Sequence, residues 1–103
     1  MVTIFHQLVE SDVPIPIAKC TTSGFRPQQL EVTWQLDNEP KESSTNLNVT
    51  QMANENKFSA ISVYSRSVSR ADNRKKLVCS VYHETLANIS AEAIILVMSK
   101  MYQ

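Results

Sequence analysis

Two cysteines and one tryptophan constrain the fold of this chain more than any other feature. Cys20, Cys79 and Trp34 are the only residues of their types among its 103 residues, and each lies where apolar and polar residues alternate. Such alternation is typical of a half-buried β-strand. A disulfide between two such strands, with the indole packed on its sulfur atoms, would hold two facing sheets together.

The separation of the cysteines favours a disulfide over a metal site. A structural zinc site needs four ligands in close groups, whereas Cys20 and Cys79 lie far apart in the sequence. As a pair they suit one long-range disulfide. Disulfides persist in oxidising compartments, so the sequence predicts an extracellular location.

Three motifs resemble those of a known family. Residues 20–27 (CTTSGFRP) are similar to a Cys-x-x-x-Gly-Phe-x-Pro motif, residues 32–38 (VTWQLDN) to Val-x-Trp-x-x-Asp-Gly, and residues 79–86 (CSVYHETL) to Cys-x-Val-x-His-x-x-Leu. All three occur in immunoglobulin superfamily domains, and the chain is most similar to their constant (C1) set. The resemblance implies that the two cysteines form a disulfide packed on the tryptophan.

Alternating stretches predict about seven short strands and no long helix. The candidate strands are residues 2–9, 15–22, 31–36, 47–52, 58–68, 77–83 and a last strand that includes 94–98. Strands at this spacing predict an all-β fold, a two-sheet Greek-key immunoglobulin-like sandwich formed by residues 1–103 as a single domain. Besides the two cysteines, the expected inward-facing core residues are Val32, Trp34, Leu36, Leu77 and Val81.

The second candidate strand carries two prolines near its start. Pro14 and Pro16 lack the backbone donor that a central strand needs, so we expect an edge or a crossover there. With Cys20 facing inward, the period of two places Ile15 and Ile17 on the outer face.

Two turns and one irregular strand are expected elsewhere. Arg26–Pro27 is a candidate cis peptide bond, because the matching turn of similar constant domains often has one. In the turn at residues 37–40, Asn38 is able to take the positive φ that the family often gives to glycine, and residues 41–46 are expected to form a loop.

The long strand at residues 58–68 breaks its own alternation. Ile61 and Val63 share a face, whereas Val68 has the opposite parity, so we expect a bulge or the strand end before Val68.

The chain departs from the family pattern before the second cysteine. Leu77 stands where the family usually has tyrosine, and Asn73 stands where it usually has aspartate, with Asp72 adjacent. We therefore expect the tyrosine corner to be absent or rebuilt.

Composition and charge argue against catalysis and against nucleic acid. The chain is 43% apolar and has a formal net charge of zero, so neither nucleic acid nor an anionic membrane is its expected partner. His6 and His83 have no Ser-Asp or Cys partner in a recognisable arrangement, and one glycine cannot form a phosphate loop. We expect a non-enzymatic protein with no metal, no cofactor and no small-molecule substrate, in which His83 has a structural role.

The sequence contains no candidate membrane span. Its longest apolar stretch, residues 93–98, is far too short, and the N-terminus lacks the features of a signal peptide. We expect one domain taken from a longer extracellular protein, attached to a membrane only through a segment outside these residues.

Two tripeptides fit the acceptor pattern for N-linked glycosylation. They are NVT at Asn48 and NIS at Asn88, both in or near predicted loops. Asn48 and Asn88 are therefore the expected glycosylation sites. The alternative interpretation is two ordinary turn asparagines.

The last strand is apolar on both faces. Ile95 and Val97 share one face, and the residues of even number share the other. One face packs in the core, and the other is available to a partner, a neighbouring domain or the domain's own loops. The candidate contacts on this outer surface are Val78, Tyr82, Ile94 and Leu96.

The resemblance implies recognition of another protein. The leading hypothesis is an extracellular domain of a cell-surface receptor or adhesion protein that binds a protein partner, or a neighbouring immunoglobulin domain, in immune or cell–cell contact. The alternatives are a constant-type structural domain of an antigen-presenting or antibody-like assembly, and a secreted decoy. We expect contact through a sheet face rather than through loops 24–29 and 84–90, because a glycan on Asn88 would crowd the second loop.

Overall fold

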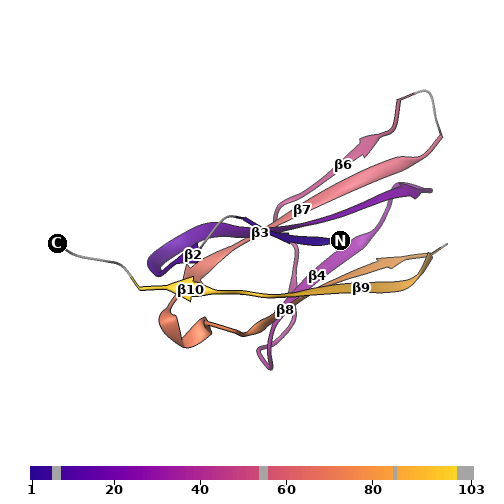
Figure 1. Cartoon of the computed structure of the whole chain (residues 1–103). Helices are drawn as coiled ribbons and strands as arrows, with labels where there is room; N and C mark the ends of the chain where they lie inside the picture. Colours follow the sequence, from indigo (N-terminus) through magenta and orange to yellow (C-terminus); the bar gives the residue numbers. More distant parts are fainter. Residues whose placement is uncertain (6–7, 54–55, 85, 100–103) are drawn as a thin grey trace.

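The computed structural model describes residues 1–5, 8–53, 56–84 and 86–99, which form a β-sandwich with one short 3-10 turn (Figure 1). The elements are β1 (Val2–Ile4), β2 (Leu8–Val9), β3 (Ser11–Phe25), β4 (Glu31–Leu36), β5 (Glu42–Ser43), β6 (Leu47–Gln51), β7 (Phe58–Val68), η1 (Arg70–Asp72), β8 (Lys76–His83), β9 (Leu86–Ile94) and β10 (Val97–Met98). Within the described ranges, no helix is long and apolar enough to cross a membrane.

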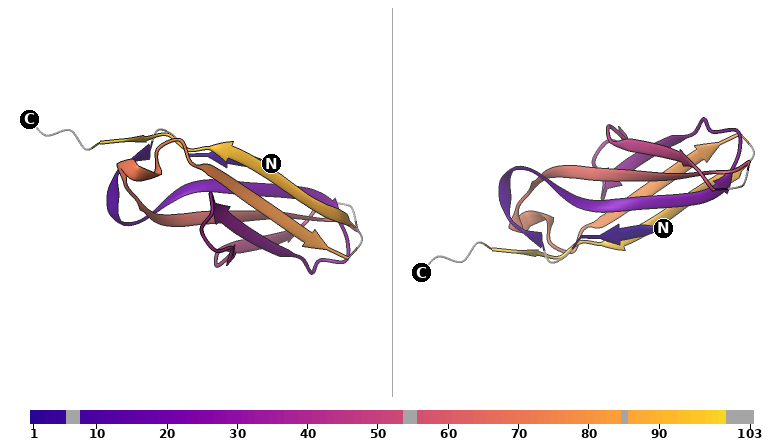
Figure 2. Two further views of the ribbon diagram at one scale, coloured as in Figure 1. Left: turned by 90° about the horizontal axis from the view of Figure 1, so that it is seen from below. Right: turned by 90° about the horizontal axis from the view of Figure 1, so that it is seen from above.

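Two four-stranded antiparallel sheets form the layers of the sandwich, with strand orders β1-β3-β7-β6 and β5-β4-β8-β9. The two views in Figure 2 show these layers facing each other. The predicted all-β immunoglobulin-like sandwich is confirmed. The expected first strand is divided, however: β1 pairs with β3, whereas β2 pairs in parallel with β10. Residues 41–46 also include the short strand β5 rather than loop alone.

The core centres on the disulfide between Cys20 of β3 and Cys79 of β8, which joins the two sheets. Trp34 lies beside Cys79 in the β4–β8 ladder and is 1% exposed. Its indole stacks on the ring of Tyr64, with the centroids 5.1 Å apart. The other predicted core residues are all buried: Val32, Leu36, Leu77 and Val81. A disulfide that closes a loop of this length adds about 4 kcal/mol of stability in the chain-entropy model.

Strand β3 contains extra residues that the alternation pattern hides. The strand runs through Pro14 without a break. Near the two prolines its only ladder partner among the described residues is β7, because the pairing with β1 covers Ala18 to Cys20, so the expected edge is confirmed. Between Pro16 and Ala18, β3 advances two residues while β7 advances one, which makes Ile17 the extra residue of a bulge. Ile17 and Ala18 are therefore both fully buried, and Ile15 is half-buried against the core. The outward prediction for Ile15 and Ile17 is wrong for this reason.

Strand β7 has the predicted bounds, but its even-numbered residues face the core, and Ile61 lies on the other face. Ser62, Tyr64 and Val68 are buried, whereas Ile61 is 45% exposed. The register shifts between the two strands all add residues to β3. Strand β7 therefore needs no bulge before Val68, and it ends at that residue.

The two turn predictions have different outcomes. The Arg26–Pro27 peptide bond is cis, as expected. In the turn after β4, Asp37 rather than Asn38 has the positive φ, at 48°. Asp37 takes this conformation while its backbone amide donates to the Lys76 carbonyl and its carboxylate accepts from the Lys76 amide. The two bonds attach the end of β4 to the start of β8.

Candidate functional site

The outer face of the β5-β4-β8-β9 sheet brings together side chains from strands that are distant in sequence. Odd-numbered residues of β8 are buried in the core, so its even-numbered residues point outward. We call this surface the β8 face. Its paired residues, in order along β8, are Lys76 with Ile94, Val78 with Gln35 and Glu92, Ser80 with Thr33 and Ser90, and Tyr82 with Glu31.

Three of the four predicted contact residues lie on the β8 face. Val78 and Tyr82 are half-buried among their neighbours, and Ile94 is 53% exposed. Leu96 lies two residues beyond Ile94, after the end of β9, and is 59% exposed. Their part in an interface stays a prediction. Sequence reasoning did not include Glu92 or Gln35, because only the strand register places them beside Val78.

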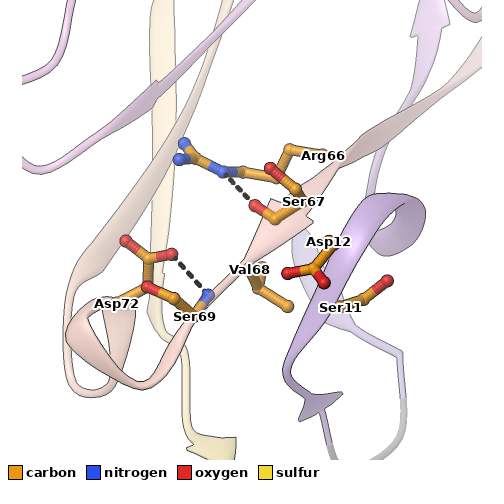
Figure 3. Close-up of a pocket in the computed structure, with 7 residues that line it drawn as sticks. All are labelled: Ser11, Asp12, Arg66, Ser67, Val68, Ser69 and Asp72. Atoms are coloured by element: carbon orange, nitrogen blue, oxygen red, sulfur yellow. Dashed lines mark hydrogen bonds between the residues drawn. The ribbon is translucent and has the colours of Figure 1, made fainter.

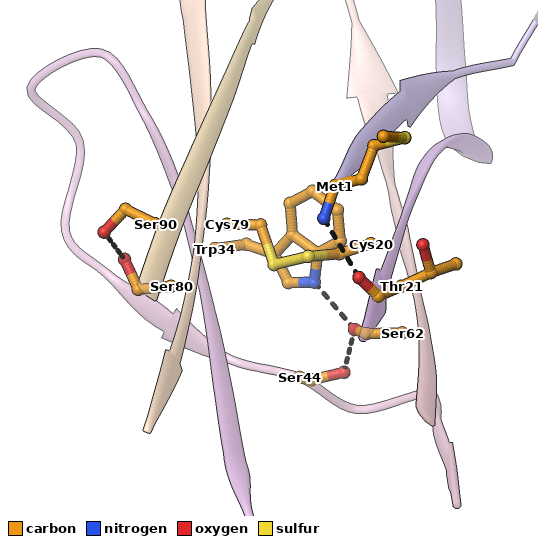
Figure 4. Close-up of a disulfide and its surroundings, with 9 residues drawn as sticks. All are labelled: Met1, Cys20, Thr21, Trp34, Ser44, Ser62, Cys79, Ser80 and Ser90. Atoms are coloured by element: carbon orange, nitrogen blue, oxygen red, sulfur yellow. Dashed lines mark hydrogen bonds between the residues drawn. A yellow bond between two sulfur atoms is a disulfide. The ribbon is translucent and has the colours of Figure 1, made fainter. Parts of the chain in front are cut away.

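The centre of the β8 face is occupied by small polar side chains. Ser80 is buried, and its hydroxyl lies 3.4 Å from that of Ser90 across the β8–β9 ladder (Figure 4). At one end, Lys76 and Glu92 form an exposed ion pair at 3.7 Å. Such exposed pairs contribute about 0–1 kcal/mol, so the pair adds little to the stability of the fold. Apolar side chains therefore stand at the two ends of the face rather than at its centre.

The loop end of the sandwich is tied together by His83. Its Nε2 lies 2.6 Å from the carbonyl oxygen of Pro27, and its ring meets Phe25 edge-on with centroids 5.3 Å apart. His83 is buried, so the structure gives it the structural role that the sequence predicted. His6 lies outside the described residues.

The opposite end is held by an ionic cluster in place of a tyrosine corner. Leu77 is fully buried at the tyrosine position. Arg66 of β7 forms an ion pair at 3.0 Å with Glu39, which lies in the turn after β4. Nζ of Lys75 lies 2.9 Å from Oδ1 of Asp72 and 3.8 Å from Oε2 of Glu39. The cluster thus connects β7, the β4–β5 turn and the segment before β8.

Asp72 is the most buried carboxylate of this cluster. Burial by itself would raise the pKa of Asp72, but the backbone amide of Ser69 donates to its carboxylate at 3.0 Å and Lys75 adds an ion pair. Together these partners lower the pKa of Asp72 below its ordinary value. The cluster therefore has a structural role, since each of these charges faces an opposite one.

Comparison with family models identifies the fold family. Residues 2–89 match the model of the CD80-like C2-set immunoglobulin domain. The chain belongs to this family. The predicted immunoglobulin relationship is confirmed, and the matching set is C2, whereas the sequence motifs resemble C1 most. No curated protein matches the chain.

Domains of this family are generally non-enzymatic and commonly take part in protein–protein recognition. The disulfide and the family together indicate an extracellular location for this C2-set domain. In the ranges that the structure describes, no group of three His, Cys, Asp or Glu side chains could hold a metal ion.

Both glycosylation acceptors of the C2-set domain lie in strands rather than loops. Asn48 is exposed on β6, and Asn88 lies on β9, with its side chain outside the described residues. Because β9 begins at Leu86, the loop expected at residues 84–90 is much shorter. Strands β6 and β9 are both edge strands, and the polar residues typical of exposed edges resemble a loop in sequence.

A polar surface hollow of about 340 Å³ lies beside the ionic cluster of the C2-set domain (Figure 3). Arg66 and Asp72 line it together with Ser11, Asp12 and Ser69. The Arg66 guanidinium is already held by Glu39, and the Asp72 carboxylate by Lys75 and the Ser69 amide. The hollow therefore follows from the structural cluster and offers no catalytic arrangement.

Proposed function

We propose that the chain is an extracellular domain of a cell-surface receptor or adhesion protein, and that it recognises a protein partner through the β8 face. The observation that supports this proposal is the exposure of two apolar side chains, Ile94 on the β8 face at 53% and Leu96 just beyond the end of β9 at 59%. Interfaces combine apolar contacts with polar groups, and the β8 face carries both, with its apolar side chains toward the ends. Tyr82 adds an aromatic side chain of the kind enriched among binding hot spots.

The polar centre of the β8 face favours a reversible contact over a permanent one. Obligate interfaces resemble a protein core cut in half and are strongly apolar. Here Thr33, Ser80 and Ser90 occupy the middle of the sheet, and the charged pair of Lys76 and Glu92 lies near its end. This composition supports a receptor or adhesion role rather than an obligate structural subunit of a larger assembly.

The test is a binding screen with the folded domain. The secreted domain, biotinylated and tetramerised on streptavidin, would be applied to cells that each display one membrane protein. We expect specific staining of at least one displayed protein, and we expect Ile94→Asp and Leu96→Asp to remove it. The matched control is Ile61→Asp, because Ile61 has a similar exposure of 45% on the other sheet and should keep binding.

A second control separates the sheet face from the loop end. Arg26→Glu changes an exposed residue in the loop between β3 and β4, next to Pro27, which contacts His83 at the opposite end of β8 from the pair of Lys76 and Ile94. If only Arg26→Glu loses binding, recognition occurs at the loops and the β8 face proposal is wrong. If no displayed protein is stained, the recognition role itself is contradicted.

A further inference from the structure

We propose that Asn48 carries an N-linked glycan, and that this glycan covers the outer face of the β1-β3-β7-β6 sheet around Ile61. The acceptor tripeptide is complete, because Thr50 supplies the hydroxyl two residues after Asn48. Both residues are exposed on β6, so the acceptor amide and its hydroxyl partner are on the solvent side. The disulfide between Cys20 and Cys79 independently indicates passage through an oxidising secretory compartment, where such glycans are added.

The strand register places Asn48 directly beside an exposed apolar side chain. Asn48 of β6 pairs with Ile61 of β7, and Ile61 pairs with Thr21 of β3, so the three residues form one row across the sheet. Residues directly opposite each other in antiparallel strands have Cβ atoms about 4.5–5.5 Å apart. The first sugar on Asn48 therefore lies within reach of Ile61, which is 45% exposed.

The same sheet face has a surface hollow on the side of Ile61 that lies away from Asn48. A surface hollow of about 420 Å³ is lined by Ile61, Thr21, Ser59 and their neighbours. The lining thus combines the hydroxyl-bearing Thr21 and Ser59 with the apolar Ile61, and sugars present both hydroxyls and apolar ring faces. An oligosaccharide that extends from Asn48 along the row thus meets groups that match its chemistry.

The position of Asn48 also protects an exposed sheet edge. Strand β6 is the last strand of its sheet, so one side of its backbone pairs with no other strand in the part of the chain that the structure describes. Such an edge is a template for pairing with another chain, and natural proteins block it with bulky or charged groups. A glycan on the second residue of this five-residue strand would block that approach.

The modification is a simple group transfer. The side-chain amide nitrogen of Asn48 forms a bond to the anomeric carbon of a lipid-linked oligosaccharide. The bond from that carbon to the lipid pyrophosphate breaks, the pyrophosphate leaves with the electron pair, and the amide nitrogen loses one proton. The donor belongs to the secretory compartment and not to this chain.

Mass spectrometry of the domain secreted from mammalian cells tests the site. We expect the peptide that contains Asn48 to carry a glycan that peptide N-glycosidase removes. Thr50→Ala should lose this glycan, whereas the matched variant Thr50→Ser keeps the acceptor pattern and should retain it. An unmodified Asn48 peptide from folded, disulfide-bonded protein would overturn the proposal.

Hydroxyl-radical footprinting tests the covering of Ile61. Oxidation of Ile61 should be about two- to threefold lower in the glycosylated protein than after enzymatic removal of the glycan, because the sugar excludes solvent from the side chain. Val13 is the internal control, since it is 63% exposed near the start of β3, away from the row of Asn48, Ile61 and Thr21, and should be oxidised equally in both samples. Equal oxidation of Ile61 in the two samples would refute the covering even if the glycan is present.

Discussion

Ser62→Ala should destabilise this domain well beyond the usual effect of losing one hydroxyl group. Ser62 is 1% exposed, and its Oγ accepts a hydrogen bond of 2.8 Å from Nε1 of Trp34 (Figure 4). The alanine variant leaves the indole N–H in the core without this acceptor. A buried donor that loses its partner costs about 1–3 kcal/mol, so we expect a decrease of that size in the free energy of unfolding.

Ser44→Ala is the matched control for this prediction. The hydroxyl of Ser44 contacts that of Ser62, but Ser44 is only half-buried. Its removal leaves the bond between Trp34 and Ser62 in place and allows water to reach the vacated side. We therefore expect Ser44→Ala to cost less than Ser62→Ala, at about 0.5–1.5 kcal/mol for a typical hydrogen bond.

Urea unfolding without reductant measures both effects. Unfolding is monitored by circular dichroism and by the fluorescence of Trp34, the only tryptophan in the chain. We expect the urea midpoint to fall while the m value stays unchanged. A double-mutant cycle with Trp34→Phe and Ser62→Ala isolates the pair, and its coupling energy should be at least about 0.5 kcal/mol. The reasoning is refuted if Ser62→Ala costs no more than Ser44→Ala, or if the two cycle mutations are additive.

Two further predictions test the bulge and the ionic cluster. Ile17→Ala should lower the free energy of unfolding by about 2–5 kcal/mol. Val13, in the same strand, is 63% exposed, so Val13→Ala should change this free energy by less than about 0.5 kcal/mol. Equal effects of the two substitutions in urea unfolding would place Ile17 outside the core. Because the pKa of Asp72 is lowered in the folded state, its ionised carboxylate stabilises the fold at pH values above its ordinary pKa of 3.8. This stabilisation is lost as the pH falls through the folded-state pKa. The melting temperature of Asp72→Asn should therefore fall less on acidification than that of the wild type, and parallel curves would contradict this.

Strands β4 and β8 could be predicted from sequence because they pair with each other in unbroken register. Strand β4 covers the expected residues, and its alternation assigns Val32, Trp34 and Leu36 inward without error. The same holds for Leu77 and Val81 around Cys79 in β8. Where the outward-facing residues of such a strand are mostly polar, alternation shows its orientation directly.

The polar groups in the core could not be predicted in this way. Ser62 is buried beneath Trp34, but the apolar Ile61 and Val63 on either side of it lie on the other face of β7, so alternation alone did not identify the core face. Tyr64 and Ala60, which share the parity of Ser62, were the available signal for the correct face. The cluster of Arg66 and Glu39 likewise joins residues whose proximity depends on the packing of two sheets.

The sequence by itself thus determined the inward residues of β4 and β8, because these depend on alternation within one strand. The sandwich and its disulfide followed from the resemblance of three motifs to immunoglobulin domains. The tertiary structure alone decided that β3 holds Ile17 and Gly24 as extra residues, and that Asn48 lies beside Ile61 and Val78 beside Glu92. The reason is that register is a relation between two strands. Register is determined by the contacts between the two strands, so it cannot be predicted from the residues of either strand alone.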